Sequence, residues 1–515
     1  MAEIGAHADT IIIGAGSSGT VIAARATEDS AREVLLIEAG PDYPSLDDVP
    51  RDLRDGTRNS MVRHDWGQRH RATLGHRWLY WFPRGRVVGG SSAVNTCIAL
   101  RGQPRDYDEW ASMGLPDWTF AACLPAFKRL ENDLDVRSAW HSQDGPVPLR
   151  RHPPRELVPW QAGFLEACGA MGFPRCDDSN DPTTTGYGPH AMNKVDGVRM
   201  SVARCYLTAP VRARRNLRIM PGTLVRRVLL SNRRVEGVEV EIDGRAHTIT
   251  SRRVVVCAGA TGTPGLLMRS GIGPRGGVER LGVDLVADVP AVGARVLDHP
   301  GAAIFLRPKR GIQSLKHPLI QTVLRYASRR GGRDGSVPND MVLQAGSCVP
   351  LPFATLPLVS IMCSLGKPDG CGTIEIRSAD PRARPHIESR LLANAADRAR
   401  AVEALRIAVD LASSAPLREI ATFFWPPKRA LASDESLSRW IGRVSDSSYH
   451  PCGTVPMGAD SSPNAATDGR GRVRGVEGLW VADASLMPTI PSAHTNLTTI
   501  MMGERFGEWM KMGVM

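Results

Sequence analysis

The sequence contains no apolar run that approaches the roughly 20 residues a membrane-spanning helix needs. It also shows no secretory signal, because the ten residues before Ile11 contain acids where a basic region would be needed. Aromatic residues are scarce at 5%, while 42% hydrophobic and 23% charged residues are typical of a globular protein. We therefore expect a cytoplasmic protein without a transmembrane segment.

Cysteine pairs of the C-x-x-C type are also missing, although the chain has ten cysteines. This absence argues against a zinc ribbon or a thioredoxin-like dithiol, so we expect no metal site and reduced, mostly buried thiols. The formal net charge of +11 comes mainly from arginines that are dispersed along the chain. Dispersed arginines are typical of a solvated surface, and we expect no nucleic-acid partner.

With 515 residues, the chain exceeds one compact core, and its length predicts roughly two to four structural units. The first forty residues are typical of a βαβ unit, with apolar runs at Ile11–Ile13 and Glu33–Glu38 around a small-residue helix at Gly19–Ala26. Further predicted elements are an antiparallel region with strands at 217–220, 225–230, 235–242 and 247–250, strands at 252–259 and 372–377, and helices at 397–412 and 497–502.

The segment Gly14–Gly19 matches the pattern G-x-G-x-x-G between the first predicted strand and the first predicted helix. In this pattern the first glycine permits a tight turn, Gly16 lets the backbone approach a pyrophosphate, and Gly19 lets the helix pack on the strand. Glu38 lies nineteen residues after Gly19, where an acid can accept hydrogen bonds from ribose hydroxyls. An acid there disfavours NADP, but the pattern alone does not separate FAD from NAD.

A second glycine-rich segment, Pro83–Gly102, combines backbone amides, small hydroxyls and the Asn95 amide. Such a loop can approach a flat ring or anionic oxygens closely, and it can equally be a structural turn. Gly85–Asn95 resembles the first signature of the glucose–methanol–choline (GMC) family of FAD oxidoreductases, and Gly259–Gly273 resembles the second. The resemblance continues, in the family's order, through 377–381, 450–454 and 481–491. It therefore covers nearly the whole chain.

The resemblance implies an α/β fold, α+β overall, in which a Rossmann-type FAD-binding domain is interleaved with a substrate-binding domain built on an antiparallel sheet. The expected FAD-binding segments are 1–155, 201–300 and 436–515, and the last of these also carries the catalytic histidines. The expected substrate-binding segments are 156–200 and 301–435. A nicotinamide dehydrogenase is disfavoured, because two further flavin-associated segments match and no separate nicotinamide motif is present.

The resemblance also assigns residues to the cofactor. The implied FAD-binding residues are Gly14, Gly16, Ser17, Ser18, Gly19, Glu38, Ala39, Arg86, Val88, Gly89, Ser91, Asn95, Thr96, Val225, Ala258, Gly259, Asp483, Ala484, His494, Thr495 and Asn496. Some relatives attach FAD covalently through a histidine just before the asparagine of the first signature. That position here is Val94, which has no nucleophilic nitrogen, so we expect FAD to be non-covalent.

Two of the thirteen histidines adjoin segments rich in Gly, Pro, Ser and Thr. His450 precedes 451–456, and His494 lies just before the predicted helix at 497–502. A lone histidine is more often a surface or core hydrogen-bonding residue than a catalytic one. The family, however, places His at the first position and His or Asn at the second, so the resemblance implies that His450 and His494 are catalytic.

Alcohol oxidation requires removal of the hydroxyl proton and transfer of a hydride from carbon to flavin N5. We predict that His450 is the general base and that His494 hydrogen-bonds the substrate oxygen as alkoxide charge develops. FAD carries the redox chemistry, while the protein orients a small-molecule alcohol. The electron acceptor is then oxygen or another carrier.

Two other functions fit the same motifs. One is a non-redox lyase of the hydroxynitrile lyase type on the same FAD scaffold, and the other is an FAD-binding structural or sensor protein. The motifs do not determine whether the enzyme is an oxidase or a dehydrogenase, and they do not determine its oligomeric state. Substrate identity depends on the variable regions, roughly 155–200 and 300–435, and candidate substrates are aliphatic, aromatic or furanic primary alcohols.

Overall fold

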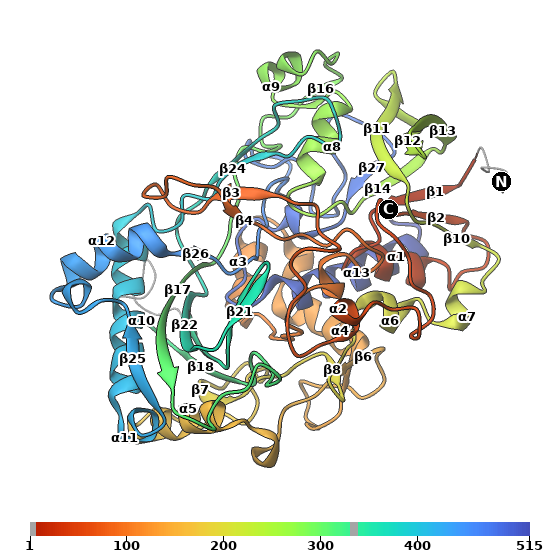
Figure 1. Ribbon diagram of the computed structural model, residues 1–515. Coiled ribbons are helices and arrows are strands. Elements are labelled where there is room, and N and C mark those ends of the chain that lie inside the picture. The colour runs from red at the N-terminus through yellow and green to blue at the C-terminus, as the bar shows by residue number, and fades with distance from the viewer. Residues whose placement is uncertain (1–6, 330–337) are drawn as a thin grey trace.

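The computed structural model describes residues 7–329 and 338–515. Its two largest sheets lie on opposite sides of the molecule in Figure 1, with a parallel sheet close to both termini and an antiparallel sheet away from them. This combination confirms the predicted α/β fold with an additional antiparallel sheet. The domain boundaries stay a prediction.

The parallel sheet has the strand order β10-β2-β1-β14-β27. Its strands are β1 Thr10–Ile13, β2 Val34–Ile37, β10 Leu217–Met220, β14 Arg253–Val256 and β27 Leu479–Val481. β1, β2 and β27 are buried along their whole length, as expected of parallel strands covered on both faces. Helix α1 (Gly19–Ala26) connects β1 to β2, so the predicted βαβ unit is confirmed.

The C-terminal helix α13 (Thr495–Lys511) packs along α1, which brings the two ends of the sequence together (Figure 1). The prediction of a helix over 497–502 was too short, because the helix continues through Gly503 and Gly507 to Lys511. A Cβ at Gly503 would lie 2.9 Å from the Val21 Cβ, and one at Gly507 would lie 2.6 Å from the Arg25 Cβ. The two glycines therefore allow close contact between the helices and do not end α13.

The antiparallel region predicted at 217–257 is partly confirmed. β11 (Leu224–Ser231), β12 (Arg234–Ile242) and β13 (Arg245–Thr250) form an antiparallel meander, and left-handed residues at the predicted breaks make the tight turns. The assignment of Leu217–Met220 to this region was wrong, because β10 pairs in parallel with β2. A short apolar run carries no information about the direction of its partner strand.

The antiparallel sheet has the order β25-β17-β22-β19-β18-β7, and β26 also pairs with β17. Its strands are β7 Gly186–Pro189, β17 Pro300–Pro308, β18 Thr322–Tyr326, β19 Met341–Gly346, β22 Val359–Leu365, β25 Ala421–Trp425 and β26 Asp446–Ser447. Helices α5 (Pro159–Ala170) and α10 (Ala395–Ser413) cover one face and share a core with Leu343 and Ile361. Because side chains alternate along a strand, Gln344 points to the opposite face.

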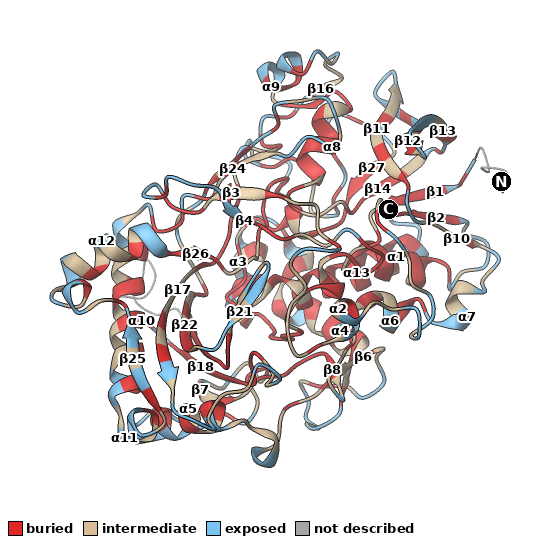
Figure 2. Cartoon of the chain, viewed as in Figure 1, coloured by how far each residue is buried: buried red, intermediate tan, exposed pale blue. Residues whose placement is uncertain are grey.

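The remaining elements connect these sheets. They are α2 Arg51–Arg54, β3 Arg69–Arg71, β4 Tyr80–Trp81, α3 Pro104–Ser112, α4 Phe120–Leu130, β5 Glu131–Asp133, β6 Val147–Leu149, β8 Lys194–Val195, β9 Val198–Arg199, α6 Val202–Tyr206, α7 Ala209–Arg212, α8 Thr263–Arg269, β15 Ile272–Gly273, α9 Arg275–Arg280, β16 Ala287–Asp288, β20 Val349–Leu351, β21 Ala354–Leu356, β23 Thr373–Glu375, β24 His386–Glu388, α11 Ala415–Arg418 and α12 Asp434–Val444. α10 and β23 confirm the helix predicted at 397–412 and the strand predicted at 372–377. Figure 2 shows that α1 and α13 are almost wholly buried, whereas α9 and α12 are partly exposed.

Two composition-based expectations are tested by the structure. Nine of the ten cysteines are buried, as predicted, and the exception is Cys371. Across the residues that the structure describes, no helix combines the length and apolarity needed to cross a membrane.

The buried carboxylate of Glu504 joins α13 to three other helices. It accepts hydrogen bonds from Arg25 of α1, Arg129 of α4 and the Tyr206 hydroxyl of α6. We expect Glu504→Gln to lower the free energy of unfolding by about 1–3 kcal/mol, because the charge-assisted bonds to two guanidinium groups are lost. Urea denaturation measures this loss. The control is Glu508→Gln, which removes a more exposed partner of Arg129 and should cost less than about 1 kcal/mol. Equal losses would contradict the prediction.

Candidate active site

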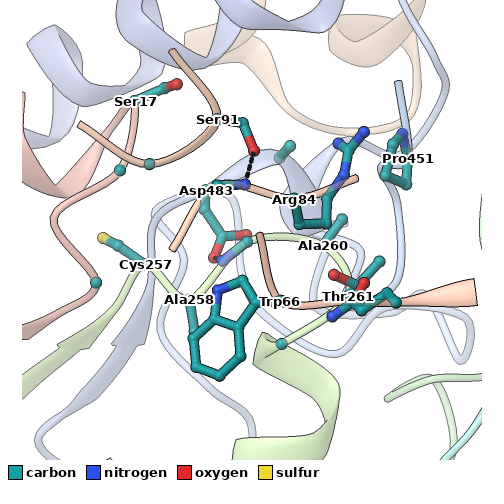
Figure 3. A pocket seen from close by; sticks show the side chains of 18 of the residues that line it. Ser17, Trp66, Arg84, Ser91, Cys257, Ala258, Ala260, Thr261, Pro451 and Asp483 are labelled. Atoms are coloured by element: carbon teal, nitrogen blue, oxygen red, sulfur yellow. Dashed lines mark hydrogen bonds between the residues drawn. The ribbon is translucent and has the colours of Figure 1, made fainter. Parts of the chain in front are cut away.

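A large cavity begins at the carboxyl ends of the parallel strands. It holds about 2080 Å³ of empty space, is open to solvent, and is lined by Ile13 of β1, Ile37 of β2 and Cys257 directly after β14. In open parallel sheets, ligands bind in the crevice at this edge. Figure 3 shows side chains from several distant segments around the cavity, among them Ser17, Ser91 and Asp483.

The two glycine-rich segments form one cradle at the wall of this cavity. Gly14 has a φ of +100°, which only glycine adopts easily, and makes the tight turn after β1. A Cβ at Gly90 would lie 2.6 Å from the Gly16 Cα, so the two loops touch backbone to backbone. The Gly85 N–H donates to the Ser91 hydroxyl (3.2 Å, Figure 3), which holds the second loop closed. The second segment, which sequence alone left open between a structural turn and a ligand loop, therefore lines the cavity together with the first.

Glu38 lies at one end of the cavity, directly after β2. Its carboxylate accepts hydrogen bonds from the N–H groups of Ala15 (3.1 Å) and Gly40 (2.8 Å). Burial raises the pKa of Glu38 to about 7, against the opposing effect of these two bonds. Val225 of β11 lines the same end. An acid fixed beside the glycine turn is suited to accept hydrogen bonds from a ribose.

Asp483 is buried deeper in the cavity, after β27. One carboxylate oxygen accepts from the Gly259 N–H (2.8 Å) and the Thr263 hydroxyl (2.6 Å), which joins it to the second signature. The Ser17 hydroxyl of the first motif donates to the Asn496 side-chain oxygen (2.8 Å) at the start of α13. These bonds join Asp483 to the second signature at 259–273, and the glycine motif at 14–19 to the start of α13. All of these segments line the same cavity.

The two predicted catalytic histidines meet in the wall of the cavity. The ring centroids of His450 and His494 are 4.7 Å apart, edge to face, and both side chains line the cavity. His450 follows β26, and His494 immediately precedes α13. Burial lowers the pKa of His450 well below 6.5, and the neighbouring His494, His299 and Arg84 lower it further. His450 is therefore neutral and able to accept a proton at neutral pH.

Three polar residues near this pair escaped the sequence analysis. The His299 ring lies 5.1 Å from the His450 ring, and the His190 ring lies 6.0 Å from the His494 ring. The Gln344 side-chain nitrogen lies 2.8 Å from His190 Nε2 and 3.4 Å from His494 Nε2. Strand alternation on β19 could have placed Gln344 opposite the apolar core, but no spacing pattern singles out His190 or His299.

Most of the predicted site residues line the cavity. These are Gly14, Gly16, Ser17, Ser18, Glu38, Ala39, Ser91, Asn95, Thr96, Val225, Ala258, Gly259, His450, Asp483, Ala484, His494, Thr495 and Asn496. Four predicted cofactor residues do not line it: Gly19, Arg86, Val88 and Gly89. A Cβ at Gly19 would lie 2.0 Å from the Gly14 carbonyl, and the Gly89 N–H donates to the Ala15 carbonyl, so both serve the turn geometry. Val88 is buried in the core, and the exposed Arg86 lies over Trp66.

The residues present fit FAD. The glycine cradle leaves room for a pyrophosphate, Glu38 supplies acceptors for ribose hydroxyls, and Asp483 lines the same cavity as the cradle and the histidines. The cavity also continues past Trp66 and Arg84, which sequence analysis did not assign (Figure 3). One elongated cavity thus joins dinucleotide-binding features to a pair of neutral imidazoles.

The histidines around the cavity are expected to make the fold acid-sensitive. Burial lowers the pKa of His299 to about 4 and of His494 to about 3, and lowers those of His190 and His450 well below 6.5. The unfolded chain binds protons at these residues near pH 6.5, so stability falls as the pH decreases from 6.5 toward 4. Each histidine contributes about 1.4 kcal/mol per pH unit in that window.

Urea denaturation at pH 7.5, 6 and 5 measures this dependence. The plot of unfolding free energy against pH should be less steep for His494→Asn below pH 6.5. The slope should decrease by about 1.4 kcal/mol per pH unit, the contribution of one proton. An identical slope in the two proteins would contradict the assignment of a neutral, buried His494.

Comparison with known proteins gives the same family at both ends of the chain. Residues 8–301 and 368–503 match the two profiles described as GMC oxidoreductase. An uncharacterised GMC-type oxidoreductase of Mycobacterium tuberculosis is 36% identical, over 97% of this chain and 98% of its own. An oxygen-dependent choline dehydrogenase of Photobacterium profundum is 31% identical, over 96% and 92%. The crystal structure of pyridoxine 4-oxidase from Mesorbium loti has a TM-score of 0.89 at 28% identity, covering 97% of this chain and 98% of the other.

Proposed function

Because this chain belongs to the GMC oxidoreductase family, we propose that it oxidises the CH–OH group of a small-molecule alcohol to a carbonyl with bound FAD. The observation that carries the proposal is the meeting of His450 and His494 in the wall of the same cavity that the dinucleotide cradle lines. FAD, when bound, supplies the acceptor for the hydride that leaves the substrate carbon.

The chain's own residues would hold FAD along the cavity. Glu38 would accept hydrogen bonds from the ribose, Gly16 and Ser91 would lie against the pyrophosphate, and Asp483 would lie beside the ribityl chain. Val94 lines the cavity and carries only hydrocarbon, which supports non-covalent attachment at this position.

His450 is the proposed general base. Its imidazole is half-buried and lines the cavity, and its lowered pKa keeps it neutral, so it can take the hydroxyl proton as the C–H bond breaks. His494 is the proposed hydrogen-bond donor to the substrate oxygen. Its Nε2 lies 3.4 Å from the amide nitrogen of Gln344, and its Nδ1 has no hydrogen-bond partner among the described residues. This division of labour lets one imidazole accept the proton while the other stabilises the developing alkoxide.

A primary alcohol is the proposed substrate class. Choline and pyridoxine, which are named for two of the proteins similar to this chain, both carry a CH2OH group. The ring of Trp66 and the side chains of Gln68 and Arg84 line the cavity, so a substrate there would meet both an aromatic face and polar groups.

An alcohol panel tests the proposal. Purified FAD-loaded enzyme is mixed without oxygen with choline, pyridoxine, benzyl alcohol and short aliphatic alcohols, and the flavin absorbance and carbonyl product are followed. We expect at least one primary alcohol to bleach the flavin with formation of one carbonyl per FAD. Turnover of a cyanohydrin without bleaching would support the lyase alternative instead, and absence of both would favour a binding protein. Admission of air then reports whether oxygen reoxidises the flavin.

A further inference from the structure

A buried histidine lies directly behind the proposed base. His299 Nδ1 is 3.0 Å from His450 Nδ1. We propose that His299 is a positioning residue that fixes the tautomer of His450, so that the proton-accepting lone pair is on Nε2. This inference rests on the proposed function of His450 as the base.

The hydrogen bonds of His299 determine which of its nitrogens carries the proton. Its Nε2 lies 2.9 Å from the Gly366 carbonyl oxygen and 3.0 Å from the Pro491 carbonyl oxygen. Carbonyl oxygens only accept, so Nε2 must be the N–H donor. In a neutral imidazole the other nitrogen is then an acceptor, and Nδ1 of His299 presents a lone pair to His450.

The proton positions on His450 follow from this arrangement. Two lone pairs cannot face each other at 3.0 Å, so His450 Nδ1 must be the donor of the bond between the rings. The neutral His450 ring then has its lone pair on Nε2, while the side chain lines the cavity. When the substrate O–H bond breaks, the proton forms a new N–H bond at Nε2. The Nδ1–H of the resulting imidazolium stays bonded to His299.

The surroundings of His299 keep its imidazole neutral. The residue is buried, and burial lowers its pKa to about 4. A neutral histidine accepts one hydrogen bond without adding a charge beside the base. It therefore selects the tautomer of His450 while leaving that imidazole free to become positively charged during the reaction.

The backbone fixes the distance between the two rings. Leu297 and Cys452 exchange both backbone hydrogen bonds, and the Ser448 N–H donates to the His299 carbonyl oxygen (2.9 Å), so the segments that carry His299 and His450 are paired on both sides of the two rings. Asp298 adds a second tie, because its Oδ1 accepts from the backbone N–H groups of His299 (2.8 Å) and His450 (2.9 Å). The two histidines are thus carried on adjoining segments whose relative position cannot change without breaking four hydrogen bonds.

Three variants test the proposal by anaerobic stopped-flow reduction of the FAD-loaded enzyme. His299→Leu removes the acceptor and should slow the limiting rate of flavin reduction by about 10- to 100-fold, with the alcohol Kd within about threefold of wild type. His299→Gln offers both an N–H donor to the carbonyls and an oxygen acceptor to His450, and should stay within about fivefold of the wild-type rate. In a His450→Gln background, His299→Leu should cause no further loss.

FAD absorbance and the melting temperature of each variant establish that the enzyme is folded and loaded. A wild-type rate for His299→Leu, with His450→Gln slow, would overturn the role of His299 while the proposed function stands. A His299→Gln enzyme as slow as His299→Leu would also overturn it, because a residue needed only to fill space is not rescued by hydrogen-bonding groups. A fast His450→Gln enzyme would overturn both proposals.

Discussion

His450→Gln should reduce its flavin about 10²- to 10⁴-fold more slowly than the wild-type enzyme when mixed with a primary alcohol without oxygen. The glutamine amide can hydrogen-bond but cannot accept a proton at neutral pH, so the hydroxyl proton has no acceptor at the position the imidazole occupies. Because the lowered pKa of His450 keeps it neutral before reaction, the substitution removes a base without removing a charge from the resting site. The fold and FAD content should therefore be little changed.

Stopped-flow spectroscopy at saturating alcohol measures this rate. The matched control is His76→Gln, which replaces a buried histidine that packs against Tyr80 and does not line the cavity. It should reduce at the wild-type rate. If His450→Gln and His76→Gln were equally fast, another group would have to take the proton, and the assignment of His450 would be wrong.

Gly16→Val is expected to prevent tight binding of FAD. A Cβ at Gly16 would have only the Gly90 Cα near it, at 4.0 Å, so the fold without cofactor has room for a side chain. The valine methyl groups would instead occupy the space at which a pyrophosphate approaches the backbone. Overpacking of this kind costs up to about 3 kcal/mol, which corresponds to about a 150-fold higher Kd for FAD.

Fluorescence titration of the apoprotein with FAD measures this Kd, and urea denaturation of the apoprotein reports the fold. Gly442→Val in α12 is the matched control, because a Cβ there meets no atom within 4 Å and the residue lies outside the cavity. It should bind FAD like the wild type. Equal FAD affinity in the Gly16 and Gly442 variants would show that the pyrophosphate does not lie against this turn.

Sequence could predict the parts of the site in which the local backbone geometry allows only one residue type. Gly14 needs a positive φ and Gly16 needs to leave space, and both requirements are written in a pattern of six residues. The apolar run at 497–502 predicted only part of α13, because Gly503 and the residues after it are held in the helix by the contact between α13 and α1. Local reasoning failed for β10, whose partner is set by tertiary packing.

The residues behind the catalytic pair had no comparable local reason to be noticed. His299 contacts His450 across 151 residues of sequence, and His190 and Gln344 meet only because β18 joins β7 and β19 in one sheet. Their positions follow from backbone pairing: the bonds between Leu297 and Cys452 and from Ser448 to His299 bring the two segments together, and alternation on β19 turns Gln344 away from the apolar core. Such contacts become predictable only once the register is known.

We propose that this chain removes a hydride from an alcohol carbon beside His450 and His494 in the FAD cavity. This is tested by mixing the FAD-loaded enzyme without oxygen with a primary alcohol that is a substrate. The rate of flavin reduction is compared with the rate for the same alcohol carrying deuterium on the CH2OH carbon. We expect the absorbance of the oxidised flavin to be lost, one aldehyde to form per FAD, and the flavin to be reduced more slowly by the deuterated alcohol. Conversion of substrate with the flavin spectrum unchanged would contradict it.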